Sequence, residues 1–390
     1  MTAFVDAIVV GGGAMGSAAA FELARRGIDV VLFERFGPGH THGASHGASR
    51  NFNLSYGDPV YLRMLAEALP AWRELEVETG ARLLDQVGIV NHGGNPDFDE
   101  IAGILPRFGF EAELLGPAEA DRRWPGIRFD QRVLYTPEAG RLDADAAVAA
   151  FQHAARAHGA QVEHHSRVTR IRILGDERAQ VEVVRTDAQG DPLGDPEVFE
   201  SRRLVVTLGA WTTKLLGGAI VLPRFTVTQE QPAHFAPRDD AVVWPGFNHS
   251  PSAGDPHYGY WRSPVYGMQT PGQGIKAGWH GVGPVTDPDA RTFRSEPRQL
   301  AALRRYAREW LPGVDPDAFT EISCTYTTTR DSNFVIDRIG PVTVGAGFSG
   351  HGFKFTPVVG RYLAELTEGL RAPSLFSLKA ERRTSVPSRG

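Results

Sequence analysis

Apolar positions at the start of the chain change from a continuous run to a helical spacing and back to a run. Residues 7–10 form a short, uninterrupted, largely β-branched apolar segment, which is typical of a buried parallel strand. Between residues 14 and 26 small and apolar side chains recur at helical spacing, and Gly27 provides an end signal before a second apolar run at residues 30–33. The pattern therefore predicts a strand, a helix and a second strand in direct succession.

Further along, the periodicity of apolar residues predicts a longer series of elements. Helical spacing predicts helices over residues 58–79, 142–158, 296–310 and 357–369. Apolar or alternating runs predict strands at residues 161–163, 168–171, 204–210, 334–337 and 342–344. Between residues 221 and 279 aromatic and polar residues alternate, as at 258–261 and 275–279, so we expect an antiparallel sheet in this part of the chain.

The turn after the first strand has the spacing of a dinucleotide-binding motif. Gly11 permits a tight turn, Gly13 lets the backbone approach a diphosphate, and Gly16 lets the helix lie close to the strand. The start of the helix offers unpaired N–H groups to phosphate oxygens. Glu34 ends the second strand, 23 positions after Gly11, close to the spacing at which a carboxylate meets ribose hydroxyls. Strand, helix, strand and acidic residue together predict that the chain binds a dinucleotide.

The order of the elements predicts two units that each use separate parts of the chain. We expect an α/β plus α+β fold, in which a Rossmann-like nucleotide-binding domain accompanies a discontinuous antiparallel-sheet substrate domain. The nucleotide-binding domain is expected to combine residues 1–85, 145–218 and 315–390. The substrate or catalytic domain is expected to combine residues 86–144 and 219–314.

Composition narrows the class of protein. The 41 Lys and Arg against 46 Asp and Glu give a net charge of −5, so no basic field favours nucleic acid or anionic lipid. The only cysteine, Cys324, excludes an internal disulfide framework, and no paired histidine and carboxylate spacing suggests a metal. No secretory signal and no membrane-spanning apolar stretch is recognisable, so we expect a cytoplasmic protein without a membrane partner.

Several separated stretches resemble the monomeric sarcosine oxidase and N-methyltryptophan oxidase family of flavoenzymes. The matching segments are residues 11–16 with Glu34, residues 46–50, residues 209–211, residues 274–280, residues 324–327 with Asp331 and Asp337, and residues 347–354. The last two segments are the most specific, because a generic dinucleotide-binding protein has no reason to carry them in this order. The resemblance implies FAD as the cofactor, and therefore an FAD-binding domain of the type described above.

The resemblance also implies which residues hold and tune the flavin. In this family FAD is attached as a thioether to a cysteine that matches Cys324, and a lysine matching Lys276 promotes the reaction with O2. The expected catalytic residues are Lys276, His280, Arg50 and His46. The expected cofactor-binding residues are Gly11, Gly13, Ala14, Met15, Gly16, Glu34, Arg35, Ser49, Arg50, Val168, Gly209, Trp211, Cys324, Gly347, Gly350, Gly352 and Lys354.

The expected substrate residues are Lys354, Tyr266, Asn53 and His280, and one of them departs from the family. Where the family usually has an arginine that grips the substrate carboxylate, this chain has Asn53, which offers neither the charge nor the bidentate geometry of arginine. Lys354 alone remains to hold a carboxylate, so simple sarcosine is in doubt as the substrate. Residue type alone favours other interpretations of these positions. Cys324 would be an ordinary buried side chain and Lys276 a solvated lysine, and His280 and Tyr266 would be packing residues.

The expected function is FAD-dependent oxidation of a secondary or N-methylated amine or amino acid. A hydride equivalent passes to flavin N5, an imine forms, and O2 is reduced to H2O2; the partners are a small amine and O2, and the family favours a monomer. One alternative is a flavin dehydrogenase or desaturase of a cyclic imino acid or biosynthetic amine. Another is a flavin-binding protein without catalysis. A nicotinamide dehydrogenase fits the first forty residues but leaves the C-terminal segments unexplained.

Overall fold

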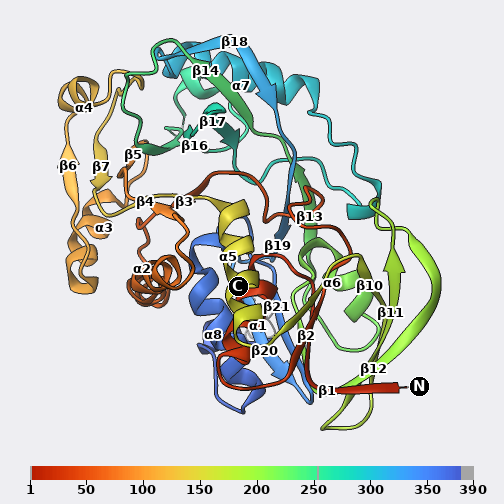
Figure 1. Cartoon of the computed structure of the whole chain (residues 1–390). Coiled ribbons are helices and arrows are strands. Elements are labelled where there is room, and N and C mark those ends of the chain that lie inside the picture. The colour runs from red at the N-terminus through yellow and green to blue at the C-terminus, as the bar shows by residue number, and fades with distance from the viewer. Residues whose placement is uncertain (1, 253, 379–390) are drawn as a thin grey trace, which may run out of the picture.

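Two eight-stranded sheets dominate the computed structural model, which describes residues 2–252 and 254–378 (Figure 1). In the first sheet the order is β10-β11-β12-β1-β2-β9, and β21 pairs with both β12 and β20. Neighbours β12, β1, β2 and β9 run parallel, whereas β10 to β12 form an antiparallel extension. The strands are β1 (Thr2–Val10), β2 (Val30–Phe33), β9 (Gln161–Glu163), β10 (Ser166–Ile173), β11 (Ala179–Thr186), β12 (Pro192–Val206), β20 (Val335–Ile339) and β21 (Val342–Ala346).

Helices cover this sheet and build the largest apolar core. Every residue of α1 is buried, because α1 lies between the sheet and the neighbouring helices α5 and α8. Small side chains such as Ala18 and Ala19, both fully buried, allow this close packing. The helices of this part are α1 (Ala14–Ala24), α2 (Pro59–Thr79), α5 (Ala144–Ala157), α6 (Thr212–Leu216) and α8 (Thr356–Thr367).

The second sheet lies at the top and upper left of the view in Figure 1 and has the order β18-β14-β17-β16-β15-β5-β7-β6. It is antiparallel except for the pair β15 and β5. Leu303, Tyr306 and Trp310 of α7 (Pro297–Trp310) belong to the apolar core of this part. The strands are β5 (Ile89–Gly93), β6 (Glu113–Leu115), β7 (Val133–Thr136), β14 (Ala233–Pro237), β15 (Gly246–Ser250), β16 (Val265–Thr270), β17 (Gly274–Trp279) and β18 (Val314–Glu321).

Two small sheets join the large ones. One consists of β3 (Arg50–Phe52), β8 (Gly140–Leu142) and β4 (Leu84–Asp85), and the other pairs β13 (Thr226–Glu230) with β19 (Cys324–Thr328). The short helices α3 (Phe98–Ile104) and α4 (Pro117–Arg123) complete the structure at the left of Figure 1. Within the described residues, none of the helices has the length and apolar character needed to cross a membrane.

The predicted fold class is confirmed: a Rossmann-like sheet with parallel strands stands beside a largely antiparallel one. The division into domains at residues 85, 144, 218 and 314 stays a prediction. The helix predicted over residues 58–79 is confirmed as α2. It begins after a capping side chain, since Asp58 Oδ1 accepts a hydrogen bond from Val60 N at 2.7 Å. It ends at Gly80, whose φ of 71° is the left-handed conformation typical of a helix end.

Three details of the predicted elements are wrong. Residues 258–261 are not a strand, because the Asp255 side chain caps a 3-10 turn at Pro256–Tyr258 and the aromatic rings pack inward. The strand predicted at 204–210 ends at Val206, where the chain leaves the sheet and forms a 3-10 turn at Gly209–Trp211. The helix predicted from residue 142 begins at Ala144, because Asp143 is its cap and Leu142 pairs in β8.

Two buried histidines stack in the core of the second sheet. His92 and His249 are both 0% exposed, and their ring centroids are 3.8 Å apart. His249 Nδ1 lies 3.3 Å from the Tyr306 hydroxyl, but three of the four ring nitrogens have no hydrogen-bond partner among the described residues. Burial lowers the pKa of His92 to about 3 and also lowers that of His249, on which His92 acts in the same direction. Both rings are therefore neutral in the folded protein near pH 7.

We expect this pair to make the fold sensitive to acid. A histidine whose pKa is lowered by folding binds a proton more readily in the unfolded chain, so stability is complete above about pH 6.5 and falls below it. In His92→Phe the loss of unfolding free energy below that pH should be smaller by about 1.4 kcal/mol per pH unit. Urea unfolding at pH 7 and pH 5 measures this, with the exposed His153→Gln as the control. Equal pH slopes in wild type and His92→Phe would contradict the assignment.

Candidate active site

One cavity of about 990 Å³ follows the carboxyl ends of the parallel strands and extends into the second sheet. Ligands of open α/β sheets bind at this edge, where the loops between strands and helices meet. The cavity wall combines segments from the whole chain, namely residues 10–15, 33–41, 43–51, 207–211, 264–266, 324–327 and 347–354.

The cavity collects the residues that the sequence predicted for the site. Its lining includes Gly11, Gly13, Ala14, Met15, Glu34, Arg35, His46, Ser49, Arg50, Asn53, Val168, Gly209, Trp211, Tyr266, Lys276, His280, Cys324, Gly347, Gly350, Gly352 and Lys354. Gly16 does not line it, because it faces the strand side of α1. The roles assigned to these residues stay predictions, but their convergence on one cavity is a structural fact.

The turn after β1 fits the diphosphate of a dinucleotide. Gly11 has a φ of 98°, and a Cβ at this position would lie 2.7 Å from the Thr207 carbonyl oxygen. A Cβ at Gly16 would overlap the carbonyl oxygen of Gly11, so α1 approaches the turn only because residue 16 has no side chain. The first turn of α1 contains no acidic side chain, which leaves its positive end available to an anion.

We expect Gly16→Ala to damage this turn. The added methyl group must displace Gly11 or α1, which should cost about 1–3 kcal/mol of stability and lower the fraction of the protein that incorporates flavin. The control is Gly103→Ala in α3, where an added Cβ has no neighbour within 4 Å and should leave stability unchanged or slightly raised. Thermal unfolding and the ratio of flavin to protein absorbance measure both. Normal flavin content in Gly16→Ala would contradict the role given to this glycine.

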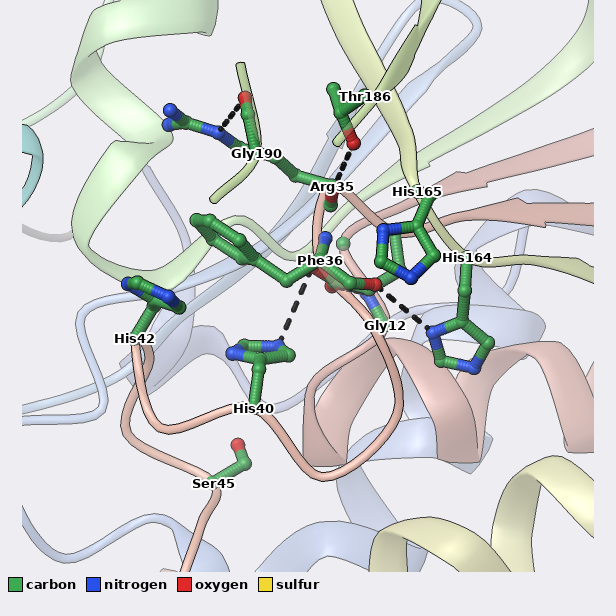
Figure 2. Close-up of polar contacts among 12 residues, drawn as sticks. Gly12, Arg35, Phe36, His40, His42, Ser45, His164, His165, Thr186 and Gly190 are labelled. Carbon is green, nitrogen blue, oxygen red and sulfur yellow. Dashed lines mark hydrogen bonds and ion pairs between the residues drawn. The ribbon is translucent and has the colours of Figure 1, made fainter. Parts of the chain in front are cut away.

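Glu34 lies at the end of β2 with its carboxylate held by backbone groups. Its Oε2 accepts from Gly12 N at 2.7 Å, and its Oε1 accepts from Phe36 N at 2.9 Å. His40 Nε2 lies 3.4 Å from the same carboxylate. Figure 2 shows His40, His42 and His164 around Phe36, where His164 Nδ1 is 3.2 Å from the Phe36 carbonyl oxygen. Backbone and imidazole contacts thus fix the carboxylate at the cavity wall.

Arg35 and Trp211 meet at Asp289, a residue that sequence analysis missed. The Asp289 carboxylate accepts from Arg35 Nη1 and Trp211 Nε1, each at 2.7 Å, and from Lys214 Nζ at 2.6 Å. Burial raises the pKa of Asp289, but these three donors outweigh that effect and hold it below its usual range. Asp289 lies in the loop between β17 and α7, so it joins this loop to the first sheet beside the cavity.

Lys276 lies in β17 and is only 4% exposed. Its Nζ donates to the Ser49 carbonyl oxygen at 2.9 Å and lies 3.2 Å from the Ser49 hydroxyl. Burial, together with the positive charge of Arg50, lowers the pKa of Lys276 to about 7. An anionic partner in the cavity would restore the full positive charge, so the charge of this lysine responds to what the cavity contains.

Arg50, His46 and Cys324 lie together beside Lys276. Arg50 donates to the carbonyl oxygens of Ser49 at 2.8 Å and Ala44 at 3.0 Å, and its Nη2 lies 3.9 Å from the Cys324 sulfur. Burial and the charges of Arg50 and Lys276 lower the pKa of His46 to about 3, so its ring is neutral at pH 7. Cys324, partly buried at the start of β19, therefore faces the cavity next to a fixed guanidinium.

At the other end of the cavity Lys354 is held by two residues that sequence analysis did not assign. Its Nζ donates to the Tyr56 hydroxyl at 3.0 Å and to the His351 carbonyl oxygen at 2.7 Å. The Tyr56 hydroxyl also lies 3.2 Å from His351 Nδ1. Burial lowers the pKa of Lys354 to about 7 and raises that of Tyr56. His351 stood within a quoted motif, but no sequence signal marked Tyr56.

His280 and Tyr266 lie near each other, as expected for substrate residues. The His280 ring stands perpendicular to that of Tyr266, with centroids 6.3 Å apart, and His280 Nδ1 is 3.4 Å from the Tyr326 hydroxyl. Much of the His280 surface is open to the cavity, but the enclosing walls and the charge of Lys354 lower its pKa. Tyr326 is a further lining residue, found in the Cys-Thr-Tyr-Thr motif but given no role from sequence.

The chemistry of the lining is that of an organic cofactor site. Within residues 2–252 and 254–378 no cluster of His, Cys, Asp or Glu is arranged to hold a metal ion. The cavity instead offers a glycine turn, a fixed carboxylate and buried cations. These groups fit the diphosphate, ribose and flavin of FAD in turn.

Comparison with known proteins agrees with this arrangement. The model of the FAD dependent oxidoreductase (DAO) family matches residues 6–366. The chain is 32% identical to the monomeric sarcosine oxidase of Bacillus sp. (strain NS-129), with 98% of each chain covered. It is also 32% identical to the peroxisomal sarcosine oxidase of Homo sapiens, over 99% of this chain and 97% of that one.

A solved structure supports the same relationship. NikD, described as an unusual amino acid oxidase essential for nikkomycin biosynthesis, superposes with a TM-score of 0.81 at 26% identity, over 96% of this chain and 98% of that one. The resemblance predicted from the motifs is confirmed, and with it FAD rather than a nicotinamide cofactor. The chain belongs to the DAO family of FAD-dependent oxidoreductases, as a sarcosine oxidase-like member.

Proposed function

We propose that the protein is an FAD-dependent oxidase of a secondary or N-methylated amine or amino acid, which yields an imine and reduces O2 to H2O2. The observation that carries this proposal is a single cavity in which a dinucleotide turn is joined to two buried lysines, Lys276 and Lys354. Bound FAD would supply the two-electron oxidant for the carbon next to the amine. The names of the sarcosine oxidase relatives support the CH–NH type of substrate.

On this proposal the cofactor is held by groups from both ends of the chain. The start of α1 and Glu34 take the dinucleotide part, and the glycine-rich turn at residues 347–352 takes the ring system. Lys276 and Arg50 provide positive charge where electrons arrive, and Cys324 provides a thioether tether. The Arg50 guanidinium, whose Nη2 lies 3.9 Å from the Cys324 sulfur, supports the tether by placing a fixed positive charge at the proposed point of attachment.

The substrate would lie between Lys354, Asn53, Tyr266 and His280. A lowered pKa keeps His280 uncharged at neutral pH, so it presents an imidazole rather than a second cation to the amine. An amine must be neutral to give up a hydride equivalent from the adjacent carbon, and the positive charges of Lys276 and Lys354 at the cavity favour that form. Tyr266 and Tyr326 contribute aromatic walls around this space.

Anaerobic flavin bleaching tests the proposal. N-Methyl amines and N-methyl amino acids are mixed with the purified holoenzyme, and the visible flavin absorbance is followed; we expect at least one member of the series to bleach it. Admission of air should then restore the colour with one H2O2 formed per O2 consumed. Failure of every secondary amine to bleach the flavin would favour the non-catalytic alternative.

Oxygen consumption separates the remaining alternative. A dehydrogenase or desaturase would bleach normally but recover slowly in air and rapidly with an added electron acceptor. We propose the oxidase because Lys276 is buried and ready to carry charge at the point where O2 would react. We also propose a cytoplasmic monomer, which size-exclusion chromatography and cell fractionation can test.

A further inference from the structure

Four asparagine side chains form a hydrogen-bonded chain beside the cavity. Asn51 Nδ2 donates to Asn248 Oδ1 at 3.3 Å, and Asn248 Nδ2 donates to Asn91 Oδ1 at 3.0 Å. Asn91 Nδ2 then donates to the Ser55 hydroxyl at 2.7 Å and lies 3.5 Å from Asn53 Oδ1. These residues come from β3 and the segment after it, from β5 and from β15, so two sheets cooperate in holding them.

The hydrogen bonds between the asparagines all run in one direction, and they end at the side-chain amide of Asn53, which can donate into the cavity. The backbone N–H of Ser55 can only donate, and it points to Asn53 Oδ1 at 3.2 Å. This contact fixes the orientation of the Asn53 amide, because its oxygen must face Ser55. Its Nδ2 has no hydrogen-bond partner in the described part of the chain, and Asn53 lines the cavity. Asn91 is 6% exposed and does not line the cavity, so it can affect a ligand only through its contact with Asn53.

The neighbouring cation, Lys354, already makes two hydrogen bonds. Its Nζ donates two of its three hydrogens, to the Tyr56 hydroxyl at 3.0 Å and to the His351 carbonyl oxygen at 2.7 Å, so one hydrogen remains for a ligand. Transferring a carboxylate from water into this place would be costly, since a neutral amide and a lysine with one available hydrogen cannot replace the hydrogen bonds that the carboxylate loses. A neutral carbonyl loses far less on leaving water and still accepts from Asn53 and Lys354.

We propose that Asn53, positioned by Asn91, selects secondary amines whose α-carbon carries a neutral carbonyl, as in a carboxamide, over free N-methyl amino acids. This inference rests on the proposed amine oxidation and assigns the substrate class of that same site. Asn53 is the group that meets the carbonyl, whereas Asn91 is a positioning residue that acts through it. The hydrogen bonds that run from Asn51 to Asn91 polarise the Asn53 amide. This polarisation strengthens the hydrogen bond that Asn53 Nδ2 donates to the substrate carbonyl.

The first experiment compares sarcosine with sarcosinamide in anaerobic reduction of the holoenzyme. We expect the wild type to be reduced about ten-fold more efficiently by sarcosinamide, because the neutral carboxamide loses less hydration than the carboxylate on entering the cavity. Asn53→Arg should reverse the order in favour of sarcosine. A wild-type preference for sarcosine, or a preference that Asn53→Arg leaves unchanged, overturns the inference.

A carboxamide also makes the amine less basic, so a second pair of ligands isolates the carbonyl. 2-Furamide and 2-furoate carry no amine, and each is titrated into the holoenzyme while the flavin spectrum reports binding. We expect tighter binding of 2-furamide to the wild type and of 2-furoate to Asn53→Arg; tighter binding of 2-furoate to the wild type overturns the inference. If neither sarcosine nor sarcosinamide reduces the flavin, the proposed oxidation of these amines fails, whereas this titration still decides the selectivity.

The positioning role of Asn91 has its own readout. Asn91→Leu keeps the volume but removes the support behind Asn53, so the ratio of the 2-furamide and 2-furoate dissociation constants should move toward one. Asn95→Leu, at the turn before α3, is the matched control, because Asn95 Oδ1 accepts only from Asp97 N. A general structural defect in Asn91→Leu would weaken both ligands equally, and an unchanged ratio contradicts the positioning role. Asn53→Arg tests the inference even if Asn91→Leu does not fold.

Discussion

Lys276→Met is expected to slow the reaction of the reduced enzyme with O2 by roughly 100- to 1,000-fold, the effect of removing one preorganised charge from an enclosed site. Substrate should still bleach the flavin at a rate within about ten-fold of the wild type. The reason is that electrons passing to O2 create negative charge, which a buried ammonium group would stabilise, whereas the proposed substrate residues Lys354, Asn53, Tyr266 and His280 orient the amine. Stopped-flow absorbance measures each half-reaction separately.

Lys354→Met is the matched control for that result. Both lysines are buried in the same cavity, and burial lowers the pKa of each to about 7, so a general effect of losing an ammonium group would be the same in both variants. We expect Lys354→Met to impair substrate binding and reduction while reoxidation stays near normal. If Lys276→Met slowed both half-reactions to the same extent, the assignment of Lys276 to O2 would be wrong.

Cys324→Ala is expected to abolish all covalent attachment of flavin. Wild-type protein precipitated with acid should stay yellow and fluoresce on a denaturing gel, whereas the variant should release every flavin to the supernatant. The effect is complete because Cys324 is the sole cysteine of the chain, so no other thiol can replace it. Intact mass measured before and after precipitation gives the same answer by an independent route.

The control for this prediction uses the neighbouring guanidinium. Arg50→Lys keeps a positive charge near the sulfur but loses the fork that reaches the Ala44 and Ser49 carbonyl oxygens. We expect slower attachment in this variant, with the same final product. Flavin that stays bound to precipitated Cys324→Ala would place the tether elsewhere, and wild-type protein that releases its flavin would rule out a tether altogether.

Several residues that line the cavity could be predicted from the sequence because their signals are local. Gly11 and Glu34 are marked by strand and helix patterns on either side, and α2 by the helical spacing of its apolar residues. Lys276, Cys324 and Lys354 needed the family motifs, because a single lysine or cysteine carries no pattern of its own. Once folded, these residues line one cavity.

The features of the site that could not be predicted from the sequence depend on contacts between segments that lie far apart in the chain. Tyr56 holds Lys354 across 298 positions, and Asn51 meets Asn248 across 197. Neither pair has a spacing that periodicity detects. The failed strand at residues 258–261 has the same cause, since Tyr258 and Trp261 turn inward to pack on the His249 ring, a tertiary contact that overrides strand propensity.

The two neighbours of β1 lie at very different distances along the sequence, so its two edges are paired at different times during synthesis. β1 (Thr2–Val10) pairs on one side with β2 and on the other with residues 198–206 of β12. β12 pairs in turn with β21, which is synthesised later. One edge of β1 therefore stays unpaired until residues 198–206 have been synthesised, and during that time it can pair with a wrong strand. Residues 347–354, which line the cavity, are made later still, so the complete cavity forms only after residue 354 has been synthesised.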